Sequence, residues 1–262
     1  MKLSSAGSTT TFTAPPATAV VTVDLYVPGS PTLVTVLVCF TVATLPPFSP
    51  VAAGEMIATV KIIPFAVRSA DLERALACEA GAVRLLPYHP LRVGVVSTLL
   101  PALKRATIGK TLDVLAARLA PAGATIIADT RVSHDAWPLA DALTALPDVD
   151  LAVVFGASAI TDRRDVVPAA VELAGGRVEH LGMPVDPGNL LLLGHLRRQD
   201  RKVPLIGAPG CARSPKENGF DFVLQRLLAN IAVSGADLRR MGVGGLLTEI
   251  NSRPQLRRDA DG

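Results

Sequence analysis

The sequence is poor in aromatic residues and cysteine, and it lacks a long apolar segment. Aromatic side chains make up 4% of its 262 residues. Three widely spaced cysteines (Cys39, Cys78 and Cys211) provide neither a disulfide framework nor a zinc ligand set. The longest apolar run, residues 32–45, is shorter than the ~20 residues that span a bilayer. We therefore expect a reduced, cytoplasmic protein with no membrane partner.

A strong charge of one sign is also missing. The chain has 26 basic and 23 acidic residues, for a net charge of +3, and its arginines occur as scattered pairs. Nucleic-acid binding needs basic residues gathered on one face, so no nucleic-acid partner is expected. No two of the four histidines share the spacing of metal ligands. The content of 49% hydrophobic and 19% charged residues is typical of a globular protein.

Composition changes near residue 43. The first 50 residues carry only two charges and are rich in threonine, proline and valine. We expect residues 1–42 to be a poorly organised leader with one or two strand-like pieces, and the resemblance given below implies that they are not the native start. Residues 43–90 should form a small strand–helix segment, with its helix at 70–80. Residues 91–250 should form the main domain, and residues 251–262 a basic flexible tail.

The main domain alternates apolar runs with helix-like segments. Predicted strands cover 91–98, 124–132, 149–156 and 202–210, and predicted helices 108–123, 135–146, 164–176 and 214–231. Residues 176–183 and 189–196 flank a predicted turn. This alternation predicts a three-layer α/β/α sandwich with a mainly parallel sheet. In such folds ligands bind at the carboxyl ends of the strands, so the loops there are the candidate sites. Trp137, on an amphipathic helix, is expected in the core.

The loop "FGASAITDRRDVVPAA", residues 155–170, follows a buried strand. Gly156, Ala157 and Ser158 allow a sharp turn and a close approach to a ligand. Asp165 precedes a helix with Pro168 in its first turn, where a missing N–H costs little. Two interpretations remain open: Asp165 is an ordinary helix cap, or it is a functional carboxylate.

A second loop, "APGCARSPKE", follows the strand at 202–210. Residues 214–217 read as a capping box that opens a helix, just after the Pro209–Gly210 turn. A phosphate could bind the backbone N–H groups there, with Arg213 or Lys216 as counter-charge. The alternative is a capped helix with solvated basic residues. Cys211 is expected to be a small buried thiol, although it could line a pocket.

Two other interpretations fit less well. A dinucleotide fingerprint would need a G-x-G-x-x-G turn, which no strand–helix junction supplies. A hydrolase elbow around Ser158 would need G-x-S-x-G, but Ile160 stands at the last position. Asp186 and His195 follow in the order of a triad, yet nothing in the sequence brings them together.

Taken in order, these loops resemble a known family. Residues 91–232 resemble the molybdopterin-binding domain of molybdopterin adenylyltransferases and molybdopterin molybdenumtransferases. The segments that carry the resemblance are "FGASAITDRRDVVPAA", "LGMPVDPGNLLLLG" and "LIGAPGCARSPKE". With "ATLPPFSPVAAGEMIATVKIIPFAV", "VVSTLLPALK" and "MGVGGLLTEINSRPQ" added, residues 43–257 resemble a bacterial subgroup, some members of which are fused to a molybdenum cofactor cytidylyltransferase.

The resemblance implies a binding site for molybdopterin at the carboxyl ends of the strands. It would be built from three groups of residues: Gly156, Ala157 and Ser158; Pro187, Gly188 and Asn189; Pro209, Gly210 and Ser214. Asp165 and Asp135 are the implied catalytic residues, with Asp165 holding Mg²⁺. The implied co-substrates are ATP or CTP and molybdate.

The resemblance further implies a homo-oligomer and a role in molybdenum cofactor biosynthesis, with transfer of molybdate or a nucleotide. The turn departs from the family pattern, because Ala157 and Ala159 stand where glycines are usual. A less open turn favours an alternative, in which the chain is a non-catalytic module that presents molybdopterin to a separate cytidylyltransferase.

Overall fold

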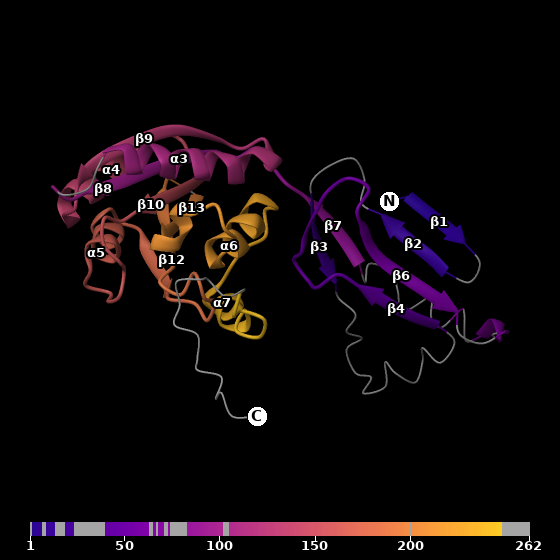
Figure 1. The fold of residues 1–262 in the computed structure, drawn as a ribbon. Helices are drawn as coiled ribbons and strands as arrows, with labels where there is room; N and C mark the ends of the chain where they lie inside the picture. The colour runs from indigo at the N-terminus through magenta and orange to yellow at the C-terminus, as the bar shows by residue number, and fades with distance from the viewer. Residues whose placement is uncertain are drawn as a thin grey trace, which may run out of the picture. The chain divides into compact units, whose positions relative to one another are not determined.

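The computed structural model in Figure 1 describes residues 2–6, 9–13, 19–23, 40–62, 65–66, 68–70, 73, 83–101, 105–199 and 201–247. The chain divides into two compact units. The first comprises Met1–Leu91, Leu119–Thr125 and Leu224–Ala232, and the second Arg92–Arg118, Ile126–Val223 and Val233–Gly262. Most of the predicted helix at 70–80 and all of the predicted tail at 251–262 lie outside the described residues.

The first unit holds two small sheets. One has the order β1 (Lys2–Ala6), β2 (Thr9–Thr13), β6 (Met56–Ile62), β4 (Phe40–Thr44). The other has the order β5 (Pro50–Val51), β3 (Ala19–Val23), β7 (Val83–Pro87). All of these neighbours pair antiparallel. Val51, Ile57 and Ala58 form a small buried cluster.

The start of the chain therefore differs from the sequence prediction. Among the described residues, three strands lie within residues 1–42 and a fourth begins at Phe40, where one or two strand-like pieces were expected. Threonine and valine favour extended backbone. β1 pairs with the adjacent β2, but two of the partners are distant in the sequence: β2 pairs with β6, and β3 pairs with β7. A local pattern cannot reveal pairing over such separations.

The second unit is built on one six-stranded sheet. Its order is β11 (Arg177–Leu181), β12 (Leu192–Arg198), β13 (Arg201–Ala208), β10 (Leu151–Phe155), β8 (Arg92–Leu99), β9 (Thr125–Ser133). β10 runs parallel to β13 and β8, and β12 runs antiparallel to β11 and β13. The N–H of Thr125 donates to Leu91 O and that of His134 to Leu99 O, so β9 runs in the direction of β8. The predicted mainly parallel sheet is confirmed, with β12 as the reversed strand.

Helices cover both faces of this sheet. They are α3 (Arg105–Leu119), α4 (Ala136–Ala145), α5 (Val166–Leu173), α6 (Gly219–Leu228) and α7 (Gly235–Arg240), together with the short turn η2 (Gly210–Arg213). The short turn η1 (Ala120–Ala122) belongs to the first unit. On one face, Leu139 and Leu143 of α4 and Val171 of α5 share a core with the sheet. On the other, the Phe155 ring of β10 lies 6.5 Å from the Phe220 ring of α6. The predicted α/β sandwich is confirmed.

One packing prediction was wrong. Trp137 was expected in the core, but its side chain is 68% exposed. It lies in the first turn of α4, two residues after the cap residue Asp135, while the buried face of that helix begins with Leu139. The periodic pattern located the helix and misassigned this side chain.

Candidate functional site

Five loops meet at the edge of the sheet where the parallel strands end. β8, β9, β10 and β13 end at Leu99, Ser133, Phe155 and Ala208. The segment between β11 and β12 reaches the same edge, because β12 starts where its parallel neighbours finish. The three segments that carry the resemblance are thus neighbours (Figure 1). Their proximity follows from the strand order.

A pocket of about 390 Å³ opens among three of these loops. Its volume is within the range of small-molecule sites. It is lined by Gly156, Ala157, Ser158, Ala159, Asp186, Pro187, Gly188, Asn189, Leu190, Pro209, Gly210, Cys211 and Arg213. Eight of the nine residues expected to bind ligand are among them; Ser214 is not, and neither are Asp165 and Asp135.

The turn after β10 forms one wall. A Cβ atom added to Gly156 would lie 3.0 Å from Ser158 O and 3.3 Å from Val167 Cγ2, so the chain passes close to its own next turn there. Every residue from 156 to 159 has an ordinary, negative-φ backbone conformation, since the left-handed positions lie elsewhere. Ala157 and Ala159 therefore cause no backbone strain.

The segment before β12 forms the second wall. Gly188 has φ of +136°, and a Cβ atom there would lie 2.5 Å from Gly219 N. The Gly219 N–H donates to Pro187 O over 2.8 Å, which ties this wall to the start of α6. The Asp186–Pro187 peptide bond is cis. Glycine is required at 188 because backbone atoms occupy the space of a side chain.

The loop after β13 supplies the cation of the site. Arg213 donates to Gly156 O over 2.8 Å and to Thr111 Oγ1 over 3.1 Å. Its guanidinium lies 5.3 Å from the centroid of the Phe155 ring. Burial lowers the pKa of Arg213, although an arginine stays charged at neutral pH. Burial also raises the pKa of Cys211, which lines the pocket as a neutral thiol.

The helix expected to open at Ser214 begins five residues later. α6 starts at Gly219, with Asn218 as its cap: Asn218 Oδ1 accepts from Phe220 N over 3.1 Å, and Asp221 Oδ2 accepts from Asn218 N over 2.9 Å. The predicted capping box at 214–217 was wrong, because this reciprocal pair caps the helix instead. The amides at the start of α6 have internal partners, so the phosphate expected beside Ser214 finds no free helix terminus there.

The two carboxylates expected to be catalytic have other contacts. Asp135 caps α4, accepting from Trp137 N over 3.1 Å. Asp165 precedes α5, and its side chain accepts no hydrogen bond from the first turn of that helix. Its Oδ2 instead accepts from the N–H groups of Thr161 and Asp162, over 2.6 and 2.9 Å. The Thr161 N–H is the main cause that lowers the pKa of Asp165. Asp135 thus caps a helix and Asp165 holds its own loop, and neither lines the pocket.

The contacts of Asp165 also bear on whether the site can hold a Mg²⁺ ion. Among the described residues, no three His, Cys, Asp or Glu side chains cluster as a metal site. Asp165, the expected Mg²⁺ ligand, uses one carboxylate oxygen for its own loop and does not line the pocket. The described residues do not by themselves fit a Mg²⁺ ion, and we derive no step through one.

Sequence reasoning missed a histidine at the site. His134 follows β9, and its Nε2 lies 2.8 Å from Ser158 Oγ, while its Nδ1 lies 2.8 Å from Thr98 Oγ1. The histidine expected for a hydrolase elbow, His195, instead pairs with Glu179 over 3.0 Å. Only the strand order β10-β8-β9 brings residues 98, 134 and 158 together, and no spacing in the sequence reports it.

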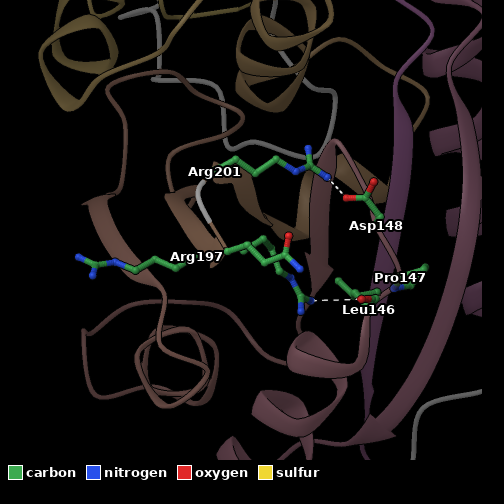
Figure 2. A pocket seen from close by; sticks show the side chains of 7 residues that line it. Leu146, Pro147, Asp148, Arg197 and Arg201 are labelled. Carbon is green, nitrogen blue, oxygen red and sulfur yellow. Dashed lines mark hydrogen bonds and ion pairs between the residues drawn. The ribbon is translucent and has the colours of Figure 1, made fainter.

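A second pocket, of about 560 Å³, lies at the opposite edge of the sheet (Figure 2). Arg201 forms an ion pair with Asp148, and the Arg197 side chain points away from this pair. Arg198 donates to Leu143 O over 2.6 Å and to Thr144 O over 2.7 Å, which caps the end of α4. Because two of its three arginines tie the β12–β13 hairpin to neighbouring backbone, this pocket is mainly structural.

No family model matches the chain, and no curated protein matches it. Within the described ranges, no helix combines the length and apolar character needed to cross a membrane.

Proposed function

We propose that this chain binds molybdopterin, or its nucleotide, in the pocket between the turn after β10, the segment before β12 and the loop after β13. One observation carries the proposal: the three segments that resemble the molybdopterin-binding family line one pocket of about 390 Å³. Residues 156–159, 186–190 and 209–213 come from separate parts of the chain. A chance likeness of sequence would not require them to share a cavity.

The chemistry of the lining suits the ligand. Molybdopterin has a pterin ring rich in N–H donors, a dithiolene and a terminal phosphate. The Asp186 carboxylate and the Asn189 amide supply acceptors for the pterin edge. Ser158 and Arg213 supply a donor and a positive charge for the phosphate. Pro187, Leu190 and Pro209 supply apolar surface for the ring.

A second candidate function is a non-catalytic module that presents molybdopterin to a cytidylyltransferase on another chain. The observation that favours it is the engagement of both expected catalytic carboxylates: Asp135 caps α4 and Asp165 bonds its own loop. Neither carboxylate lines the pocket. Transfer of molybdate or of a nucleotide from ATP or CTP would need other groups, so binding without turnover is the more economical account.

Incubation of the purified chain with molybdopterin, ATP, Mg²⁺ and molybdate distinguishes these functions. Mass analysis of the pterin product would show adenylylated or metallated molybdopterin if the chain is a transferase. Unchanged, tightly bound molybdopterin would indicate a carrier. Failure to bind any pterin would contradict both. Homo-oligomer formation and a cytoplasmic location stay predictions from the sequence.

The Asp165→Asn and Asp135→Asn variants sharpen the comparison. Asparagine retains a side-chain oxygen that can accept the same backbone N–H groups, and it removes the charge. Because Asp135 caps a helix, Asp165 holds a loop and neither lines the pocket, we expect both variants to keep molybdopterin affinity within about twofold. A large loss of turnover in either variant, with binding intact, would instead support a transferase that uses that carboxylate.

A further inference from the structure

Three hydrogen-bonded side chains lead from the sheet to the wall of the pocket. Thr98 is near the end of β8 and fully buried, His134 follows β9, and Ser158 lines the pocket. The Thr98 Oγ1–His134 Nδ1 and His134 Nε2–Ser158 Oγ distances are both 2.8 Å. These are good hydrogen bonds, and their direction decides what Ser158 can do.

The direction follows from the buried threonine. Thr98 Oγ1 already accepts a hydrogen bond from Ala157 N over 2.8 Å. Its own proton also needs an acceptor, because the hydroxyl is cut off from water. Within the described part of the chain, His134 Nδ1 is the acceptor in reach. Thr98 therefore donates to Nδ1, since the opposite tautomer would leave a buried hydroxyl proton unpaired.

The direction of the His134–Ser158 hydrogen bond is then fixed as well. A neutral imidazole that accepts at Nδ1 carries its proton on Nε2. Nε2 thus donates to Ser158 Oγ, and the Ser158 proton is left to point elsewhere; its intramolecular acceptor, Ala159 O, lies at a long 3.5 Å. His134 does not take a proton from Ser158, so the serine is not an activated nucleophile. It is a donor aimed at a ligand.

We propose that Thr98, His134 and Ser158 form a directional relay that presents the Ser158 hydroxyl to a phosphate oxygen of the pocket ligand, with His134 as a positioning residue. Successive donors polarise one another, which strengthens the last bond to an anion. Arg213 adds a positive charge to the same pocket. This inference rests on the proposed function in taking that pocket as the ligand site, and it moves the phosphate from Ser214 to the Ser158 wall.

The first test needs no ligand. A long-range proton–nitrogen correlation spectrum of the isotopically labelled full chain reports which imidazole nitrogen carries the proton. The His134 signals are assigned by their loss in His134→Gln. We expect a protonated Nε2 and an unprotonated Nδ1, and a mixed population of tautomers in Thr98→Val, with Thr98→Ser unchanged. A proton on Nδ1 in the wild-type chain would overturn the relay.

The second test measures the subsite with inorganic phosphate, titrated into the full chain and followed by amide shifts of residues 156–159. Removing a hydrogen bond to a charged ligand should weaken phosphate binding by about 10-fold or more in Ser158→Ala. His134→Ala should weaken it similarly, and His134→Gln should restore it because the amide N–H replaces Nε2–H. The control is Ser133→Ala, an exposed neighbour outside the pocket.

The two proposals fail separately. If wild type and Ser158→Ala bind phosphate equally, or wild type does not bind it, the anion subsite is contradicted whatever molybdopterin does. If phosphate binds as expected and molybdopterin does not, the subsite stands and the proposed ligand is wrong. Circular dichroism of each variant establishes that it is folded before either comparison.

Discussion

Asp221 of α6 and Arg118 of α3 form a nearly buried ion pair, with Nε 2.5 Å from Oδ1 and side chains about one-tenth exposed. The same guanidinium donates to Ala212 O and Ser214 O, each over 2.8 Å. Asp221 also accepts from the Asn218 N–H. One pair thus joins two helices, caps α6 and holds the backbone of the third pocket loop.

Arg118→Met should therefore be strongly destabilising. Methionine keeps the apolar stem but leaves the Asp221 carboxylate buried and uncompensated, a loss of about 3–5 kcal/mol in the free energy of unfolding. Adding Asp221→Asn should recover part of it, since the amide oxygen can still cap Asn218. Urea unfolding measures both. The matched control is Arg164→Met, whose pair with Asp162 is exposed and should change stability by less than about 1 kcal/mol.

Two glycines of the same pocket should differ in how much their substitution by alanine lowers stability. Gly188→Ala should cost at least about 2 kcal/mol, because its backbone is left-handed and its Cβ would lie 2.5 Å from Gly219 N. Gly210→Ala should be nearly neutral for stability, since a Cβ there meets nothing within 4 Å. Thermal unfolding of both variants is the measurement. Equal losses of stability in the two variants would contradict the close approach of Gly188 to the start of α6.

Acid should lower the stability of the second unit, because it protonates Asp150. The hydrogen bond from Arg92 is the main cause that lowers the pKa of Asp150 in the folded chain. A folded-state pKa below the usual value of about 3.9 adds stability above that value, and this stability is lost as pH falls through the lowered pKa. We expect Asp150→Asn to be less stable than wild type at pH 7. The difference should shrink on acidification below about pH 4. Urea midpoints across this range test it, and a constant difference would contradict the account.

How far the sequence predicts this molecule depends on the distance between interacting residues. The buried run 151–155 and its flanking helices were predictable because apolar period and turn residues are local. The start of α6 could not be predicted. Residues 214–217 have the sequence of a capping box, but Arg118 donates to the carbonyls of Ser214 and Lys216 and keeps this segment in a loop. The pocket loops could be predicted from strand alternation. His134 could not, since its partners lie 36 and 24 residues away.

Cys211 gives a chemical probe of the pocket. Burial raises its pKa above the usual value of about 8.5, so little thiolate, the reactive form, exists at neutral pH. Alkylation of Cys211 by iodoacetamide, read by peptide mass analysis, should be slow at pH 7 and speed up at alkaline pH. Bound molybdopterin should slow it further at each pH. If the ligand protects Cys39 or Cys78 and leaves Cys211 unaffected, it binds elsewhere.

Binding of molybdopterin between the three loops is tested most directly by a set of dissociation constants. Calorimetric titration of molybdopterin should give an affinity that falls about 10-fold in Ser158→Ala and in Asn189→Ala, which remove pocket groups. Ser214→Ala, outside the pocket, should match wild type within about twofold. The account is contradicted if wild type does not bind, or if Ser214→Ala loses affinity while the two pocket variants keep it.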